Sequence, residues 1–308
     1  MSSRPTITVA VCTRGRPGLL AGCLERLRAT VQPPDQVLVV HNAEHDEATE
    51  AVLRGAGQDW VCEPRVGLDF ARNRALREAT TEIVAFLDDD ARPEVGWLDA
   101  LAAGFAEEQV VCVSGRVLAA ELETPAQRLL EECKSFDRGD EPIDFRLGHP
   151  TFFFPVRAGV MGTGSNMACR RVAALELGFD EALDVGTPSR GAGDLDFFYR
   201  IVRAGGTVAY RPDAVVRHVH RRTEDELRQM RFDYGVASSA FAWKCLVVGR
   251  DVKAAAFLAY KVGFHCAEIA ANLLGLRRWP ARLAWQELRG MLHGPLAYRR
   301  ARRCLRTT

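Results

Sequence analysis

Short apolar segments alternate with segments of helical periodicity along the first 120 residues, and this alternation limits the folds open to the chain. The apolar segments are TITVAVCT (6–13), QVLVVHN (36–42), EIVAFLDDD (82–90) and QVVCVSGRV (109–117), which have the composition of buried strands. Between them lie PGLLAGCLERLRAT (17–30) and LDFARNRALREAT (68–80), where apolar residues recur at helical spacing. The pattern predicts an α/β fold with a mostly parallel, Rossmann-like sheet. Ligands of such sheets bind beyond the carboxyl ends of the strands.

Three acidic residues follow the apolar strand IVAFL directly, namely Asp88, Asp89 and Asp90. Carboxylate oxygens at a strand end suit Mg²⁺ or Mn²⁺, which keep open positions for water and phosphate. The alternative is that one Asp caps a helix beginning near Glu94, while its neighbours are solvated charges. Clustered like charges repel each other, so we expect a cation beside them.

Two histidines flank Val219 in the last predicted strand, TVAYRPDAVVRHVHRR (207–222). Because alternate residues of a strand point to one face, His218 and His220 are expected on the same side. They can supply a metal ligand or a phosphate-binding group, and Arg221 beside them suits a diphosphate. The alternative is a pair of partly exposed strand histidines.

Two aspartates, Asp194 and Asp196, lie in GAGDLDFFYRIVRAG (191–205), where a long loop enters a helix. A carboxylate in this place can deprotonate a substrate hydroxyl. It can equally serve as the N-cap of the helix.

Polar residues also follow the first two predicted strands. Thr13 and Arg14 follow the first, and His41 and Asn42 follow the second. Their position at carboxyl strand ends predicts contacts to a base or a ribose, although each residue type is also a frequent turn former.

Taken in order, these segments resemble glycosyltransferase family 2, the nucleotide-sugar enzymes of the fold called GT-A. The resemblance extends from about Thr6 to Arg222. It rests on the ordered set VAVCTRGRP, VVHNA, VGLDFARNRAL, AFLDDDARPEVGWL, GTGSNMACRR, LGFDEAL, GAGDLDFFYR and RHVHRR. It implies an inverting, metal-dependent glycosyltransferase that moves a sugar from a nucleotide-diphosphate donor to an acceptor hydroxyl.

The resemblance also implies roles for the polar residues at the donor and metal sites. Asp88 and Asp90 would hold Mg²⁺ or Mn²⁺ and the donor ribose, with Asp89 nearby. Asn73 and the Thr13-Arg14 pair would line the donor pocket, and the histidine pair resembles the late metal or diphosphate ligand of the family. The position of His41 is commonly an acid that contacts the nucleobase, so the nucleobase stays open.

The family's general base is usually the Asp of a Glu-Asp pair at the positions of Gly193 and Asp194. Gly193 departs from that pair, which leaves Asp194 as the expected base and Asp196 as its reserve. The departure also motivates one rival function, a catalytically inactive nucleotide-sugar-binding protein. A second rival is a nucleotidyltransferase, which the sequence disfavours because no glycine-rich, lysine-containing loop follows the first strand.

The predicted domains are a GT-A domain over residues 1–223 and a helical, basic extension over residues 224–308. From residue 277 onward nine arginines face one acid, Glu287. This segment can lie on an anionic membrane surface, dock a partner protein, or pack on the core with a solvated basic end. Nucleic acid is not an expected partner, and the acceptor stays open among saccharides, lipid-linked glycans and small molecules.

The expected location is cytoplasmic, with peripheral contact at the inner face of the membrane as an option. Nine cysteines are scattered without a Cys-x-x-Cys pair, which favours reduced thiols. Charged residues interrupt the most apolar stretch, residues 235–276, so no membrane-spanning helix is expected.

Overall fold

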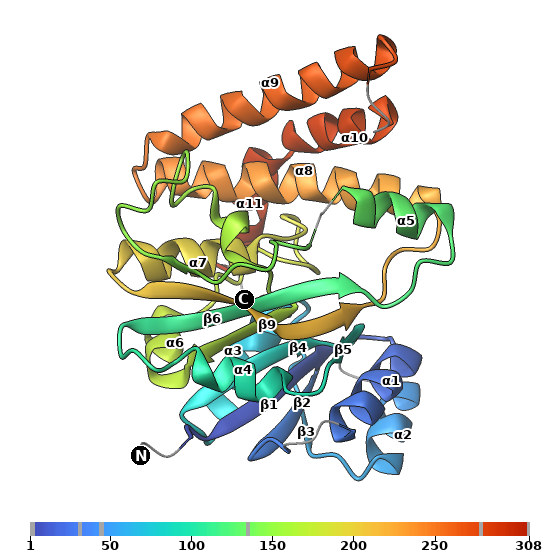
Figure 1. Ribbon diagram of the computed structural model, residues 1–308, viewed down its shortest axis with the longest axis vertical. Coiled ribbons are helices and arrows are strands. Elements are labelled where there is room, and N and C mark those ends of the chain that lie inside the picture. Colours follow the sequence, from blue (N-terminus) through green and yellow to red (C-terminus); the bar gives the residue numbers. More distant parts are fainter. Residues whose placement is uncertain (1–3, 30–32, 43–45, 134–135, 277–279, 307–308) are drawn as a thin grey trace.

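The computed structural model describes residues 4–29, 33–42, 46–133, 136–276 and 280–306, which form a central sheet with helices around it and a further helical layer above it (Figure 1). The strands are β1 (Ile7–Thr13), β2 (Gln36–His41), β3 (Trp60–Cys62), β4 (Ile83–Asp88), β5 (Ala91–Pro93), β6 (Val110–Ala119), β7 (Ile143–Phe145), β8 (Asn166–Arg170) and β9 (Thr207–His218). The helices are α1 (Pro17–Arg28), α2 (Glu47–Gly55), α3 (Leu68–Glu78), α4 (Trp97–Ala103), α5 (Pro125–Glu132), the 3₁₀ helix η1 (Ala158–Met161), α6 (Arg171–Leu177), α7 (Gly193–Arg203), α8 (Glu224–Val247), α9 (Lys253–Leu273), α10 (Ala281–Met291) and α11 (Gly294–Cys304).

The sheet has the strand order β3-β2-β1-β4-β8-β6-β9-β5, and β7 also pairs with β9. Strands β3, β2, β1 and β4 are parallel, as are β6 and β9, whereas β8, β5 and β7 run antiparallel to their partners. The predicted α/β class is confirmed. The antiparallel strands were not foreseen, because the composition of a buried strand does not encode its direction.

The register brings the polar residues of three strands to one edge. Thr13 lies opposite His41, and Cys12 lies opposite Asp88. Because β1, β2 and β4 are parallel, their carboxyl ends meet there, and the chemistry-bearing residues gather at this edge.

The core lies on both faces of the sheet, since alternate strand residues enter different clusters. Val9 and Val11 of β1 belong to one apolar cluster, while Ala10 and Cys12 belong to the other. Fully burying a Val side chain stabilises a fold by roughly 1.5–3 kcal/mol. The buried side chains of the sheet can therefore offset the cost of holding charged groups close together at its edge.

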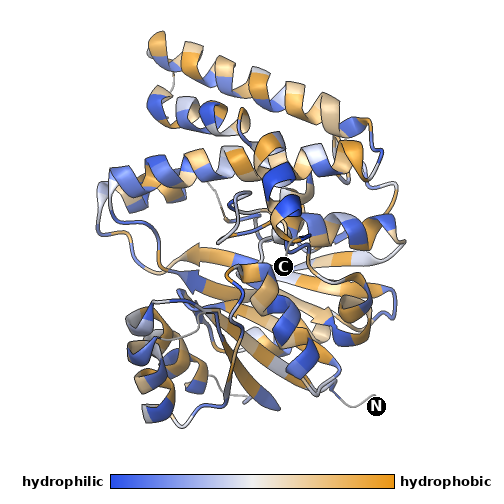
Figure 2. Ribbon diagram, turned by 180° about the vertical axis from the view of Figure 1, so that it is seen from behind, coloured by the Kyte–Doolittle hydropathy of each residue, from blue (hydrophilic) through white to orange (hydrophobic). Residues whose placement is uncertain are grey.

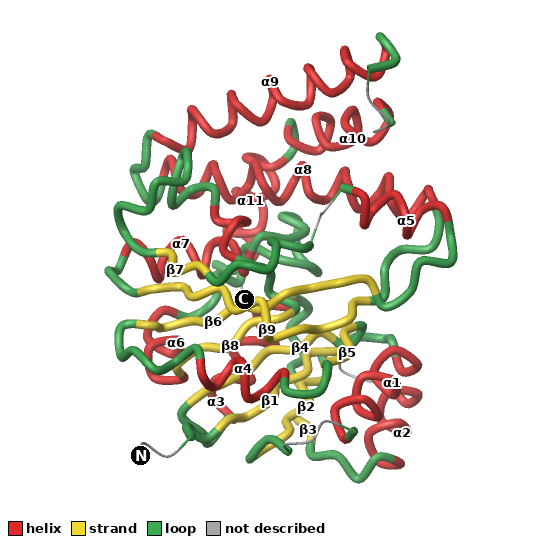
Figure 3. The backbone as a smooth tube through the Cα atoms, in the orientation of Figure 1, coloured by secondary structure: helices red, strands yellow, loops and turns green. Residues whose placement is uncertain are grey.

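The segment from Leu122 to Pro150, whose irregular sequence with several Pro and Gly residues predicts no helix or strand, contains α5 and β7. A capping box formed by Thr124 and Gln127 begins α5, with Pro125 in the first turn. That Thr-x-x-Gln pattern was the overlooked signal in the sequence. Figure 3 shows long loops between the sheet and α8, and the site described below lies among them.

The C-terminal helices pack on one another above the sheet domain. Helices α8 and α10 approach each other closely at two glycines. A Cβ added at Gly235 would lie 2.1 Å from the carbonyl oxygen of Glu287, and a Cβ added at Gly290 would lie 2.1 Å from the carbonyl oxygen of Phe232. Helix α11 buries Tyr298 in a small apolar cluster with Ala240 of α8. The basic segment therefore packs on the core with exposed arginines, the third of the arrangements considered. Arg277 and Arg278 lie outside the described residues.

Across the described residues, no helix combines the length and apolarity needed to cross a membrane.

Candidate active site

The acids at the end of β4 form a compact cluster with one histidine. Ligand atoms of Asp88, Asp90 and His218 all lie within 4.8 Å of one another. The pairing of β5 with β9 sets Ala91 opposite His218, which brings the imidazole Nε2 to 3.3 Å from Asp90 Oδ1. Two carboxylates and an imidazole are a donor set that suits a divalent cation.

The electrostatics of the cluster are those of partly buried, interacting charges. Burial, and next the charge of Asp90, raises the pKa of Asp88 to about 6. Burial opposes ionisation of Asp90 too, but His218 outweighs it and holds the pKa of Asp90 below its usual range. Asp90 in turn outweighs the effect of burial on His218 and raises the pKa of its imidazole.

The middle acid, Asp89, points away from this cluster and is fully buried. Its Oδ2 accepts hydrogen bonds from Thr13 Oγ1 at 2.7 Å and Arg16 Nε at 3.1 Å, and Arg16 also pairs with Asp90 at 2.9 Å. Burial raises the pKa of Asp89 to about 7, although Arg16 opposes the shift. Asp89 and Thr13 thus fix the loop after β1. Arg16 is part of the site, and the sequence reasoning missed it.

The two late histidines stay in contact at the end of β9, with their Nδ1 atoms 3.3 Å apart, but their Nε2 atoms face different acids. The strand ends at His218, and His220 turns its Nε2 to Glu131 of α5 at 3.1 Å. Phe136 stacks against both rings, with centroids 5.0 and 5.5 Å away. The structure therefore brings His218, rather than His220, to the carboxylates, while Arg221 lies exposed just beyond.

A cavity of about 700 Å³ opens beside the cluster. Asp88 and His218 line it from the sheet edge, and Asp194 lines it from the start of α7. The roof comes from the C-terminal helices, including Arg231 of α8 and Lys261 of α9. The extension is thus part of the wall of the site.

Asp194 is placed by the backbone. Its Oδ2 accepts a hydrogen bond from Gly164 N at 2.6 Å, and its Oδ1 accepts one from Leu195 N at 2.8 Å. The N-cap of α7 is Ala192, so the capping alternative for Asp194 does not hold. Burial, and then the charge of Asp184, raises the pKa of Asp194. A partly buried carboxylate with a raised pKa at a cavity wall is a suitable proton acceptor.

Asp196 has a different environment, although it is only two residues away. It is fully buried, and its carboxylate contacts Lys244 Nζ and Arg200 Nε, each at 2.6 Å. Since Lys244 belongs to α8, this pair ties α7 to the roof. The structure does not bring Asp196 to the cavity beside Asp194.

Arg72 is a second site residue that the sequence reasoning undervalued. It is buried, lines the cavity, and its Nη1 lies 2.5 Å from Asp184 and 3.1 Å from Asp69. An arginine on a helix most often lies on a solvated face, which is why the sequence alone did not single out this position. Yet Arg72 lies four residues from Leu68 and from Leu76, on the apolar face of α3, and this spacing was the available signal.

The side chain of Asp69 leaves room only for glycine at position 193. A Cβ at this position would lie 2.0 Å from Oδ2 of Asp69, which is buried beneath α7. Burial, and then the charge of Asp184, raises the pKa of Asp69 well above its usual range. Asp69 therefore occupies the space that a side chain at 193 would need.

Gly193→Ala is expected to lower the free energy of unfolding by about 1–3 kcal/mol, because the added methyl displaces a buried, paired carboxylate. Gly22→Ala is the matched control: nothing lies within 4 Å of its Cβ, so a gain of about 0.5–1 kcal/mol is expected in α1. Urea denaturation of both variants, and of Gly193→Ala combined with Asp69→Ala, measures the effect. A neutral Gly193→Ala variant, or a double variant with no relief, would contradict this account.

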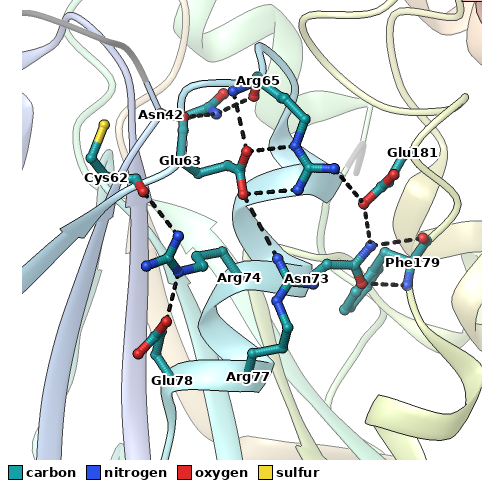
Figure 4. A network of polar contacts seen from close by, with 10 residues as sticks. All are labelled: Asn42, Cys62, Glu63, Arg65, Asn73, Arg74, Arg77, Glu78, Phe179 and Glu181. Atoms are coloured by element: carbon teal, nitrogen blue, oxygen red, sulfur yellow. Dashed lines mark hydrogen bonds and ion pairs between the residues drawn. The ribbon is translucent and has the colours of Figure 1, made fainter. Parts of the chain in front are cut away.

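The predicted donor residues Asn42 and Asn73 make structural contacts (Figure 4). Asn42 Nδ2 donates to the carbonyls of Glu63 and Arg65, at 3.0 and 2.7 Å. Asn73 Nδ2 donates to the carbonyl of Phe179 at 3.0 Å, and its Oδ1 accepts from Phe179 N at 2.8 Å. Both amides hold loops near the site in place.

The other two predicted donor residues differ in exposure. His41 is fully buried and lies edge-on to Trp60, whereas Arg14 is exposed. Their contacts to a nucleotide stay predictions.

Known glycosyltransferases are similar to this chain in sequence. The sequence profile of the family described as "Glycosyl transferase family 2" matches residues 8–172. A pre-mycofactocin glycosyltransferase of Mycobacterium tuberculosis is 33% identical over 175 residues, which are 56% of this chain and 34% of that protein. The chain thus spans about a third of that relative's length. The succinoglycan biosynthesis protein ExoM of Rhizobium meliloti is 31% identical over 221 residues, 68% of this chain and 65% of the relative.

Solved structures share the fold at lower identity. A mannosyltransferase from Pyrobaculum calidifontis, solved with GDP-Man and Mn²⁺, superposes with a TM-score of 0.62 at 19% identity, covering 95% of this chain and 88% of its own. Glucosyl-3-phosphoglycerate synthase from Mycobacterium tuberculosis, solved with Mg²⁺ and UDP, gives a TM-score of 0.51 at 18% identity, covering 79% and 78%.

Proposed function

The chain belongs to glycosyl transferase family 2, and from this premise we propose that it transfers a glycosyl group from a nucleotide-diphosphate sugar to an acceptor hydroxyl, with inversion. One observation carries the proposal: Asp88 and His218, on the side of the carboxylate cluster, and Asp194, a partly buried carboxylate, line the same cavity. Groups that could hold a diphosphate through a cation, and a carboxylate that could accept a proton, thus face the same cavity.

A divalent cation, Mg²⁺ or Mn²⁺, is part of this proposal. The donor set of Asp88, Asp90 and His218 fits it, since their ligand atoms lie within 4.8 Å and combine hard oxygens with an imidazole. Relatives of the fold were solved with Mn²⁺ or Mg²⁺. When bound, the cation would neutralise charge on the departing diphosphate.

In the proposed mechanism Asp194 accepts the proton of the acceptor hydroxyl. The N–H groups of Gly164 and Leu195 hold its carboxylate in place, which favours one orientation toward the cavity. The hydroxyl oxygen forms a bond to the anomeric carbon as the bond to the diphosphate oxygen breaks on the opposite face. A single displacement inverts that carbon. A base in this position typically contributes on the order of 10²–10⁴-fold in rate.

We assign residues 1–223 to the donor and the cation, and residues 224–308 to the acceptor side. The supporting observation is the roof of the cavity, where Arg231, Lys261 and Glu287 of three helices meet. The proposed donor contacts are those inferred from the sequence: Thr13, Arg14, His41, Asn42, Asn73, Asp88, Asp89 and Arg221, with His220 beside His218 as a further cation or diphosphate ligand.

The partners are a nucleotide-sugar donor, an acceptor that is a saccharide, a lipid-linked glycan or a small molecule, and an anionic membrane surface. Arg250 and Lys253, exposed at the start of α9, supply positive charge of the kind that such a surface attracts.

A thermal-shift panel of nucleotide sugars with Mn²⁺, followed by detection of released nucleoside diphosphate, tests the function. A donor at 100 times its Kd stabilises the fold by about 2.7 kcal/mol. Stabilisation with release is the expected result. Stabilisation without release, with any acceptor class, would favour the inactive binding protein, and no response to any nucleotide sugar would overturn the proposal.

A further inference from the structure

Helix α9 is the outermost helix of the C-terminal layer (Figures 1 and 2). Its polarity is inverted: most of its Lys, His and Glu side chains face the interior, and its solvent-facing side is mostly apolar. The buried residues of α9 are Ala254, His265 and Glu268, so two of the three are ionisable. Lys261 also turns inward, with its Nζ 2.9 Å from Glu287 of α10, and His265 lies 3.2 Å from the same carboxylate. The side chains of Lys261, His265 and Glu268 of α9 thus face the interior of the molecule.

The outward face of α9 carries no charged side chain from Ala254 onward. From Ala254 to Leu276, a stretch that the structure describes throughout, every exposed residue is uncharged. The aliphatic side chains are most exposed at the two ends, where Val252 is 77% exposed and Leu273, Leu274 and Leu276 are 72–78% exposed. Val252 and Leu274 are about six helical turns apart, so their side chains project to the same side.

The charge around this face has one sign. Among residues 247–276, all described, both acids are buried, namely Asp251 and Glu268. Arg250 and Lys253, at the start of the helix, are exposed. An uncharged face with basic residues at its edge complements an anionic lipid surface, on which an amphipathic helix lies with its apolar side in the headgroup region.

A protein partner fits this face less well. Between its ends, Ala residues surround Tyr260, Val262 and Phe264 and no exposed residue is charged, whereas a protein interface usually has a polar rim and Arg among its anchors. Phe264 belongs both to the exposed face and to the lining of the cavity. A bilayer on this face would therefore lie next to the mouth of the site.

We propose that the outward face of α9, with Val252 and Leu274 at its ends, docks the protein on an anionic lipid bilayer. Contact runs through α9 and the residues that flank it, while α11 lies on the other side of α8. The proposal does not depend on glycosyl transfer, because docking is measured without turnover.

Co-sedimentation of the full chain with phosphatidylcholine vesicles, with and without phosphatidylserine, tests the proposal. Binding to the phosphatidylserine vesicles that weakens with added salt is expected. Leu274→Asp and Lys253→Glu should each lower partition at least about fivefold, the doubly substituted chain more, because they remove apolar contact or reverse a charge at the bilayer. Donor release without lipid should stay unchanged in these variants.

Two controls match these changes. Val172→Asp adds the same charge at an aliphatic residue that is 68% exposed on α6, and Arg300→Glu reverses an exposed charge on α11. Both should bind vesicles like the unchanged chain. The proposal is overturned if Arg300→Glu abolishes binding while Leu274→Asp does not, or if vesicles are ignored. It is equally overturned if the chain is a dimer in light scattering and Leu274→Asp makes it a monomer, since a second copy would then cover the face.

Discussion

Asp194→Asn is expected to lower turnover by at least about 100-fold while donor affinity changes little. The amide keeps the size of the side chain, but it cannot take a proton from the acceptor. Its single oxygen can accept only one of the two hydrogen bonds that Gly164 N and Leu195 N donate to the carboxylate, so the melting temperature is measured as well. The donor is proposed to bind through the carboxylate cluster, which this change leaves intact. Measuring turnover and donor affinity on the same protein separates the two effects.

Asp196→Asn is the matched control, because the same substitution two residues away has a different expected outcome. Asp196 is buried between Lys244 and Arg200, and removing one partner of a buried ion pair typically costs about 3–5 kcal/mol. We expect a lower melting temperature with turnover retained in the folded fraction. If Asp196→Asn abolishes turnover without loss of stability and Asp194→Asn keeps it, the base is Asp196.

The pH dependence of the unchanged enzyme gives a further check on Asp194. Burial raises its pKa, so the carboxylate that can accept a proton is formed only above the ordinary range of an aspartate, near 3.9. Activity should therefore rise with pH through that raised pKa, and the rise should vanish in the residual activity of Asp194→Asn. A residual acid limb at the same pH would assign the limb to another group.

Asp90→Ala is expected to remove metal-dependent activity, a loss of the size that a chelator produces in the unchanged protein. Asp90 contributes one of three clustered ligands and also carries the contacts to His218 and Arg16. Turnover against Mn²⁺ concentration measures the effect. Full activity of Asp90→Ala in the presence of a chelator would contradict the proposed cation site.

Asp89→Asn serves as the control for Asp90, since it lies between the two proposed ligands. Its carboxylate contacts Thr13 and Arg16 rather than the cluster, so we expect a lower melting temperature and an unchanged Mn²⁺ dependence of the remaining activity. A shifted Mn²⁺ dependence would place Asp89 among the ligands.

Much of the sheet domain could be predicted from the sequence, because its signals are local. The apolar segments became β1, β2, β4 and β6, and acids after a buried strand marked the right edge of the sheet. The resemblance to glycosyltransferase family 2 was confirmed by the match over residues 8–172. Local signals are sufficient here because each buried strand is recognisable from its own composition.

The remaining features depend on contacts between distant segments. The role of Arg72 follows from its pairing with Asp184, 112 residues later, and the need for glycine at 193 follows from Asp69 on another helix. The inverted polarity of α9 is explained by Glu287 of α10, which no periodicity within α9 reveals. Likewise His218 and His220 alternate in sequence, yet β9 ends between them and the rings turn to different acids.

The most direct test of the account is the release of nucleoside diphosphate from a nucleotide sugar by four proteins: the unchanged chain, Asp90→Ala, Asp194→Asn and Asp196→Asn, each with Mn²⁺ and with a chelator. The account predicts release with Mn²⁺ by the unchanged chain and by Asp196→Asn. It predicts no release above background by Asp90→Ala, or by any of the four proteins with chelator. For Asp194→Asn it predicts transfer to the acceptor that is at least about 100-fold slower. Transfer that needs neither the cation nor Asp194 would contradict it.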